Sequence, residues 1–411
     1  MKKRLKHTMD KLGPGLITGC SDDDPSGIVT YTQAGAQFGL ATLWTAFITY
    51  PLMYTLQEIC ARIGIVTGFG LAGVIKKYYS KFLLYPLLVI IFPAITFNIA
   101  ANLAGMGAVA HLLYPSIPIF AYSCIFTIIL IYGLFFFNYQ KLAYVLKWLC
   151  GSLFVYFFIP FSVEQNWTEV LSATFIPYIE WNKEFITILV AILGTTISPY
   201  LFFWQANMSV EQKNHHISNG NKEIREMKFD VNIGMLFSNA VMFFIILTAG
   251  TILYPQGITH ISTVKEAAEA LKPLAGEFAY LLFSLGVLGT GFLAIPVLAG
   301  CLGYIFSDVF DWKDGLDKTP KEAKKFYSIM LASTIFALLI NLCDFDPIKA
   351  LIFAAILYGL ISPILILIIL IIANSKKIMG KRKNGFLSNL IGIITFLLMT
   401  GSACALIIEW L

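Results

Sequence analysis

Three consecutive aspartates interrupt an otherwise apolar stretch near the start of the chain. The interruption joins three carboxylates to a Pro-Ser-Gly sequence, and reads Asp22, Asp23, Asp24, Pro25, Ser26 and Gly27. A helix does not continue smoothly through proline beside glycine, because proline lacks the backbone donor and glycine is a poor helix former. Carboxylates beside free carbonyls are the ligands that hard divalent cations prefer. The sequence therefore predicts an unwound, oxygen-rich cation site here.

A second interruption of this kind lies near the middle of the chain. It runs through Gly194, Thr195, Thr196, Ile197, Ser198, Pro199 and Tyr200. Pro199 leaves a carbonyl one turn earlier without its partner, and Thr195 and Ser198 add hydroxyls at the same depth. Taken singly, Pro199 also fits a structural kink, and the aspartates also fit a solvated loop tip. The pairing of the two breaks favours a site that both of them build.

The composition places these breaks in a membrane protein. Of 411 residues, 58% are hydrophobic and 13% charged, whereas soluble domains carry about a quarter charged residues. The apolar residues form blocks of roughly 20, the length that a helix needs to cross the hydrocarbon core. The composition excludes a cytosolic enzyme, and no nucleophile-and-base motif or cofactor loop is present. Seven scattered cysteines show no metal or redox spacing.

The apolar blocks predict about eleven transmembrane helices in one all-helical domain. The expected spans are 12–40, 41–66, 83–113, 118–138, 143–163, 185–210, 229–254, 277–308, 326–343, 348–374 and 386–410. Two inverted five-helix repeats, about 12–163 and 185–374, followed by an extra helix at about 386–410, would put one break in the first helix of each repeat. Secondary transporters place the substrate at such broken helices.

The basic residues predict the orientation. With a cytoplasmic amino terminus, 25 of the 29 Lys and Arg residues fall on the inside, as the positive-inside rule requires. The odd number of spans then puts the carboxyl terminus outside, and the plasma membrane is the expected location. The net charge of +5 describes a cytoplasmic rim of basic residues, so no nucleic-acid partner is expected.

Several motifs resemble the NRAMP divalent-metal transporters. They are Gly13-Pro14-Gly15, Asp24-Pro25-Ser26-Gly27, the stretch 33–39 that reads Gln-Ala-Gly-Ala-Gln-Phe-Gly, and the stretch 64–68. The resemblance implies a fold like that of the sodium-coupled leucine transporter. It also implies a metal held midway across the membrane between the broken first and sixth helices. The transported cation is then the only metal expected, with no cofactor beside it.

The chain departs from the family motifs at the implied ligands. Ser26 and Gly27 stand where the family has Gly and a metal-binding Asn, and Thr195, Ser198 and Tyr200 stand where it has Ala, Met and His. Loss of the thioether leaves hard oxygen ligands, which suit magnesium. Small residues also leave room for the waters that magnesium retains. The same departures resemble the NRAMP-related magnesium transporters.

These residues lead to a specific hypothesis. Asp24 is expected to be the principal ligand of the cation, with Ser26, Gly27, Thr195 and Ser198 around it. Asp23, Tyr200 and Gln205 are possible pathway residues, although a continuing helix would turn Asp23 about 100° away from Asp24. Asn102 and Gly105 align with acidic residues of NRAMP proton coupling, and the family's histidine route is missing. We therefore expect a passive or weakly coupled carrier.

Other interpretations remain open at this stage. The closest keeps the family and assigns proton-coupled transport of manganese or iron. A more distant one keeps only the fold and assigns an organic solute, since fold does not fix function. Glu58 and Arg62, four residues apart in the second span, are expected to form a structural ion pair or a gating contact.

Overall fold

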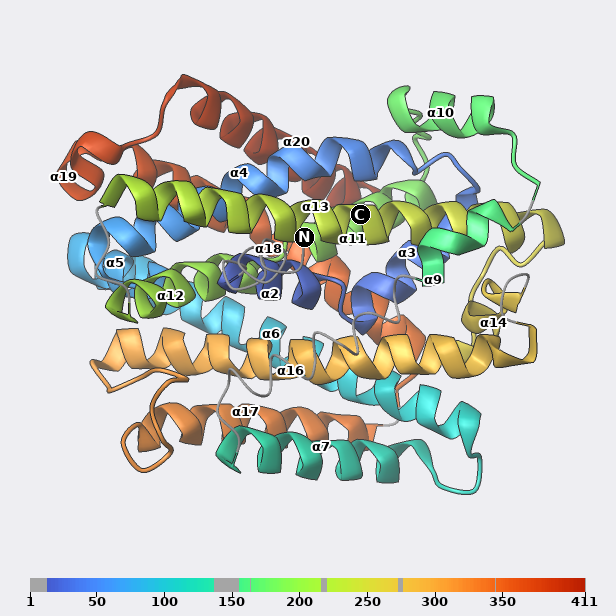
Figure 1. Cartoon of the computed structure of the whole chain (residues 1–411), viewed down its shortest axis with the longest axis horizontal. Helices are drawn as coiled ribbons and strands as arrows, with labels where there is room; N and C mark the ends of the chain where they lie inside the picture. The colour runs from blue at the N-terminus through green and yellow to red at the C-terminus, as the bar shows by residue number, and fades with distance from the viewer. Residues whose placement is uncertain are drawn as a thin grey trace, which may run out of the picture.

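The computed structural model describes residues 13–136, 155–162, 164–215, 220–272, 276–343 and 345–410, and these contain helices and no strand. The helices lie roughly parallel to the long axis of the molecule (Figure 1). Their bounds are α2 Pro14–Asp22, α3 Pro25–Phe38, α4 Trp44–Thr67, α5 Leu71–Tyr78, α6 Lys81–Leu113, α7 Ile119–Phe136, α9 Val155–Phe158, α10 Trp167–Phe175, α11 Lys183–Thr196, α12 Pro199–His215, α13 Gly220–Ile252, α14 Val264–Glu269, α16 Ala279–Phe310, α17 Lys324–Ile340, α18 Pro347–Asn374, α19 Lys376–Met379 and α20 Phe386–Trp410.

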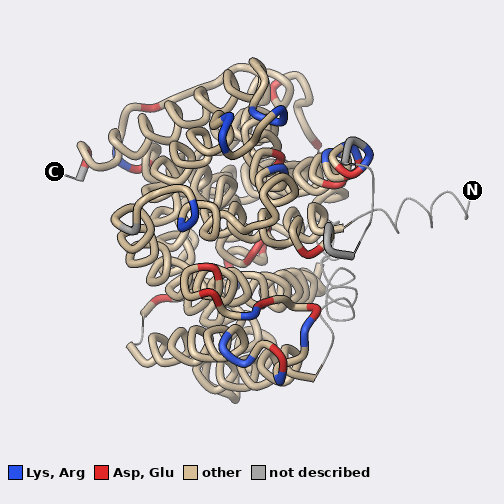
Figure 2. The backbone as a smooth tube through the Cα atoms, turned by 90° about the vertical axis from the view of Figure 1, so that its left-hand side faces the viewer, with Lys and Arg blue, Asp and Glu red and all other residues tan. Residues whose placement is uncertain are grey.

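The described helices confirm an all-helical membrane protein. Eight segments are long and apolar enough to cross a membrane, or nine if α4 and α5, which meet at a 60° bend, count as one span. Most of the predicted span at 143–163 lies outside the described residues. Figure 2 looks onto the end of the molecule where α5 and α19 lie, and Lys and Arg segments gather there.

One expected loop is wrong. The predicted spans 185–210 and 229–254 leave 211–228 as a connection between them, but α12 continues to His215 and α13 begins at Gly220. Charged residues there extend two spanning helices beyond their apolar parts, so hydrophobicity alone does not mark the helix ends.

Both predicted breaks are present and are shorter than expected. Only Asp23 and Asp24 separate α2 from α3, and only Ile197 and Ser198 separate α11 from α12. Pro25 opens α3, where its missing N–H costs nothing. The Asp24 side chain caps this helix by accepting from the Gly27 N–H. Ser26 and Gly27 were expected in unwound chain, and this is wrong, because they form the first turn of α3.

Close backbone contacts fix the two broken spans against intact ones. A Cβ placed on Gly19 of α2 would lie 2.1 Å from the Gly234 carbonyl oxygen of α13. A Cβ on Gly194 of α11 would lie 2.1 Å from the Ala355 carbonyl oxygen and 2.3 Å from the Gly359 nitrogen of α18. Small residues at these positions let helix backbones approach closely, which is how membrane helices associate.

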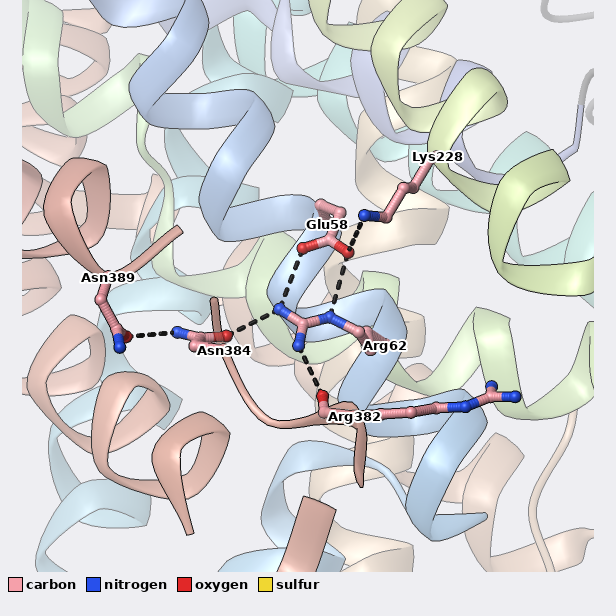
Figure 3. Close-up of polar contacts among 6 residues, drawn as sticks. All are labelled: Glu58, Arg62, Lys228, Arg382, Asn384 and Asn389. Carbon is pink, nitrogen blue, oxygen red and sulfur yellow. Dashed lines mark hydrogen bonds and ion pairs between the residues drawn. The ribbon is translucent and has the colours of Figure 1, made fainter. Parts of the chain in front are cut away.

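A buried ion pair ties α4 to the segment that joins α18 and α20 (Figure 3). The Arg62 Nε donates to Glu58 Oε1 at 3.0 Å, and Arg62 Nη2 donates to Glu58 Oε2 at 3.1 Å. Arg62 also donates to the Arg382 carbonyl and to Asn384 Oδ1, each at 2.7 Å. Lys228 of α13 lies 3.4 Å from Glu58. The predicted Glu58–Arg62 pair is therefore present and fully engaged.

Replacing Arg62 is expected to destabilise the fold. Arg62→Met leaves Glu58 buried with only the half-exposed Lys228 as a partner, and breaking one side of a buried pair costs about 3 kcal/mol or more. The thermal unfolding midpoint of the purified protein should fall by several degrees. The double variant Glu58→Gln/Arg62→Met should recover part of this loss, because it leaves no unpaired carboxylate. A double variant no more stable than Arg62→Met would contradict this explanation.

Candidate metal site

Asp24 lies at the first break with both carboxylate oxygens engaged. Oδ1 accepts from the Ser26 hydroxyl at 2.5 Å and from the Gly27 N–H at 2.9 Å. Oδ2 accepts from Asn98 Nδ2 at 3.1 Å and from Asn102 Nδ2 at 2.9 Å. The residue is only 1% exposed. Four hydrogen bonds thus hold one buried carboxylate in a fixed orientation.

The two asparagines come from α6, one helical turn apart. Asn102 was expected at this depth as the neutral counterpart of an acidic residue. Asn98 was missed, although its position four residues earlier in an apolar helix puts it on the same face. The Oδ1 atoms of both side chains are buried and form no hydrogen bond among the described residues, and the Tyr358 hydroxyl of α18, which also forms none, lies beside Asn98. Because an unsatisfied buried oxygen is costly, these two atoms are available to a cation near Asp24.

The second break lies close to the first. The Ser26 and Thr195 hydroxyl oxygens are 3.5 Å apart. A Cβ on Gly27 would lie 3.4 Å from Thr195 Oγ1. The structure thus brings Ser26, Gly27 and Thr195 together beside Asp24. The Ser198 hydroxyl instead donates back to the Gly194 and Thr195 carbonyls of α11, at 3.1 and 2.5 Å.

The other two aspartates face a different helix. Ser238 of α13 donates to Asp22 Oδ2 at 2.8 Å and to Asp23 Oδ1 at 3.3 Å. Their remaining oxygens, Asp22 Oδ1 and Asp23 Oδ2, have no partner among the described residues. The three carboxylates do not converge, and no group of three or more His, Cys, Asp or Glu side chains in the described part of the chain could hold a metal. A cation at Asp24 therefore depends mainly on neutral oxygens.

Comparison with known proteins identifies the family. The family model for Nramp, described as natural resistance-associated macrophage protein-like, matches residues 15–409. The chain belongs to the Nramp family. It is therefore a membrane transporter and not an enzyme.

Individual Nramp relatives are distant in sequence. A divalent metal cation transporter MntH from Caldanaerobacter subterraneus is 25% identical over 403 residues, which cover 96% of this chain and 90% of the relative. The protein of the same name from Clostridium acetobutylicum is 24% identical over 417 residues, covering 95% and 89%. At this identity, individual ligands do not transfer from one Nramp protein to another without their own geometry.

Solved structures agree on the fold. The Eremococcus coleocola manganese transporter, in complex with an aromatic bis-isothiourea substituted compound, is 20% identical and superposes with a TM-score of 0.77 over 97% of this chain and 86% of that one. MhsT in complex with L-phenylalanine is 12% identical, with a TM-score of 0.61 and 97% coverage of both chains. The expected leucine-transporter-like fold is confirmed.

Tyr200 and Gln205 connect the two broken spans of this Nramp protein. The Tyr200 hydroxyl on α12 donates to the Ser21 carbonyl at the end of α2, at 2.9 Å. Gln205 Oε1 accepts from the Thr18 hydroxyl at 2.6 Å. Both side chains are 1% exposed. In this conformation they hold α12 against α2, next to the candidate site.

Proposed function

We propose that this Nramp protein transports a hard divalent cation, with Mg²⁺ first, by alternating access. The observation that carries the proposal is the environment of Asp24, a buried carboxylate whose recorded partners are hydroxyl, amide and backbone groups. Oxygen ligands suit Mg²⁺, which also keeps part of its water shell. The relatives named as divalent metal cation transporters support the class of substrate.

In this proposal Asp24 supplies the charge and the neighbouring oxygens complete the site. The unpartnered Oδ1 atoms of Asn98 and Asn102 and the hydroxyls of Ser26 and Thr195 are the first candidates. Ser198 contributes through water or after a change of rotamer, and Gly27 contributes by letting Thr195 lie close to the start of α3. Asp23, Tyr200 and Gln205 lie on the pathway. Neutral Asn98 and Asn102 accept no proton, which favours transport without proton coupling.

We further infer two inverted repeats and a cytoplasmic amino terminus. The close contact of α3 with α13, where a Cβ on Gly35 would lie 2.4 Å from the Ile246 carbonyl oxygen, has a counterpart in the contact of α12 with α4, where a Cβ on Gly64 would lie 2.2 Å from the Ala206 carbonyl oxygen. In two inverted repeats α3 would then correspond to α12, and α4 to α13. The distribution of Lys and Arg supports the orientation.

A second candidate is proton-coupled transport of Mn²⁺. The Eremococcus coleocola protein of the same fold is a manganese transporter. Met106 also lies one turn beyond Asn102 on α6, and a Cβ on Gly291 would be 2.4 Å from its sulfur and 3.3 Å from Pro25 Cγ. A thioether next to Pro25 is a soft ligand close to the first break. This observation favours the manganese alternative.

The two candidates are separated by flux in proteoliposomes. Purified protein is reconstituted, and Mg²⁺ and Mn²⁺ influx are followed with and without an inward proton gradient. Mg²⁺ influx that is insensitive to the gradient supports the proposal. Mn²⁺ influx with internal acidification, lost in Met106→Leu, supports the alternative. Flux of neither ion contradicts both.

A further inference from the structure

A cavity lies away from the two breaks, beside the start of α5, the middle of α12 and the end of α16. These three helices lie together at one end of the molecule (Figure 1). The volume of the cavity is about 560 Å³. Asn207 on α12, Ser307 and Asp308 on α16, Gly70 before α5 and Trp312 after α16 are among its lining residues. Asn207 is eight residues beyond Pro199, so the cavity lies about 12 Å along α12 from the second break.

The carboxylate of Asp308 is only partly satisfied. The Gly73 N–H of α5 donates to it, but its Oδ2 is buried without a partner among the described residues. Asp230 of α13 provides an internal comparison, since it also caps a helix start and its two oxygens accept from the N–H groups of Gly13, Gly15 and Leu16. Capping of α5 therefore accounts for one carboxylate oxygen of Asp308, and the other oxygen, Oδ2, remains without a donor.

The side-chain oxygens of Ser307 and Asn207 belong to residues that line the same cavity as Asp308. The Ser307 hydroxyl has no partner among the described residues, and Ser307 is 1% exposed. Asn207 Nδ2 donates to the Phe203 carbonyl at 3.0 Å, which directs its Oδ1 the other way. That Oδ1 and Asp308 Oδ2 lie 2.2 and 2.5 Å from the position of a Gly70 Cβ, so they border the same point. Acceptors gathered without a donor repel one another unless a cation or water lies between them.

The two lysines that line the cavity balance only part of its negative charge. Lys76 pairs with Asp311, at 2.5 Å, and also donates to the Asp308 backbone carbonyl at 3.4 Å, and Lys77 lies over the Phe69 ring, 4.2 Å from its centroid. Asp308 forms no ion pair among the described residues, and Asp314 adds a further carboxylate to the cavity lining. Three carboxylates, of Asp308, Asp311 and Asp314, and two lysines line the cavity, so one negative charge is in excess beside the oxygens of Asp308, Ser307 and Asn207.

We propose that Asp308, Ser307 and Asn207 form a second binding site for a hard divalent cation, distinct from Asp24. Carboxylate, hydroxyl and amide oxygens with water are suitable ligands for such an ion. The cavity exceeds the space that one bare ion needs, so the bound ion keeps several waters. Under the proposed orientation this site faces the cytoplasm, where it would bind ions released from the first site or already present in the cell.

Terbium luminescence tests the site independently of transport. Tb³⁺ is a hard oxygen-seeking cation whose emission is sensitised by a nearby indole, and Trp312 lines the cavity. The probe is Tb³⁺ alone, added to full-length Asp24→Ala protein so that the first site does not contribute. We expect indole-sensitised emission that Mg²⁺ displaces and that falls at least about fivefold in Trp312→Phe. Emission unchanged in Trp312→Phe would place the ion elsewhere and overturn the proposal.

Variants at the ligands complete the test. Asp308→Asn should weaken Tb³⁺ binding about tenfold or more, whereas Glu322→Gln, which removes an exposed carboxylate outside the cavity lining, should change it less than about threefold. Asn207→Asp should tighten binding about tenfold, a gain that a folding defect cannot produce. Equal binding by Asp308→Asn and Asn207→Asp would overturn the site. Since the background lacks Asp24, this result does not depend on whether the proposed transport function holds.

Discussion

Asp24→Asn is expected to reduce divalent-cation uptake about 100-fold or more while the protein remains folded. The substitution removes the one charged group whose oxygens face both Asn98 and Asn102. A unit charge 4 Å from another contributes about 4 kcal/mol at an effective dielectric constant of 20, and each 1.4 kcal/mol changes a binding constant tenfold. The loss should exceed what the remaining neutral oxygens recover. Uptake is measured in proteoliposomes with matched protein content.

Comparison with Asp24→Ala separates charge from structure. The Asn side chain retains an oxygen that can accept from the Gly27 N–H, so the cap of α3 is preserved. Alanine loses the cap, worth about 1 kcal/mol, and leaves the two buried amide groups of Asn98 and Asn102 without their acceptor. Asp24→Ala should therefore unfold at a lower temperature than Asp24→Asn, with uptake lost in both. Uptake by Asp24→Asn within about threefold of the unsubstituted protein would contradict the role of Asp24.

The helix breaks were predictable because each places residues that disfavour a continuous helix inside an apolar spanning segment. Pro25 after three aspartates, and Pro199 among hydroxyl residues, identify the sites of interruption from sequence alone. Their extent was not predictable, because proline at the first position of a helix permits the helix to begin immediately. Ser26 and Gly27 therefore lie in regular helix.

The environment of Asp24 was only partly predictable. The local sequence of the two breaks proposed Ser26, Gly27 and Thr195, and these residues do come together. Asn98 lies 74 positions from Asp24, so only the three-dimensional packing of α6 brings the two together. The asparagine pair at 98 and 102 was nevertheless a usable signal, since two amides one turn apart in an apolar helix require partners.

Sequence patterns also did not reveal which glycines matter for packing. Gly194 and Gly401 both lie in apolar spanning helices. The structure separates them, because a Cβ on Gly194 would meet backbone atoms of α18 and a Cβ on Gly401 would meet nothing within 4 Å. Long-range helix contacts, which no local pattern encodes, make this difference.

Gly194→Ala is accordingly expected to prevent stable folding, whereas Gly401→Ala is tolerated. Alanine gains about 1 kcal/mol over glycine in helix propensity at either position. At Gly194 the new methyl group would lie 2.1 Å from the Ala355 carbonyl oxygen, so α11 and α18 must separate. Overpacking of this kind typically costs 1–3 kcal/mol and more where backbone must move.

Gly194→Ala should lower the stability of the fold, because the steric cost exceeds the gain in helix propensity. At Gly401 there is no steric cost, so only the gain in helix propensity remains. Yield of monodisperse protein in gel filtration and the thermal unfolding midpoint measure the difference. Gly194→Ala should give little folded protein, and what is recovered should unfold at a clearly lower temperature. Equal yields and midpoints for the two variants would mean that α11 and α18 are not in backbone contact. Thr195, which follows Gly194 on α11, would then not be held in place by α18. The contact of Thr195 with Ser26, on which the geometry of the Asp24 site depends, would lose its support.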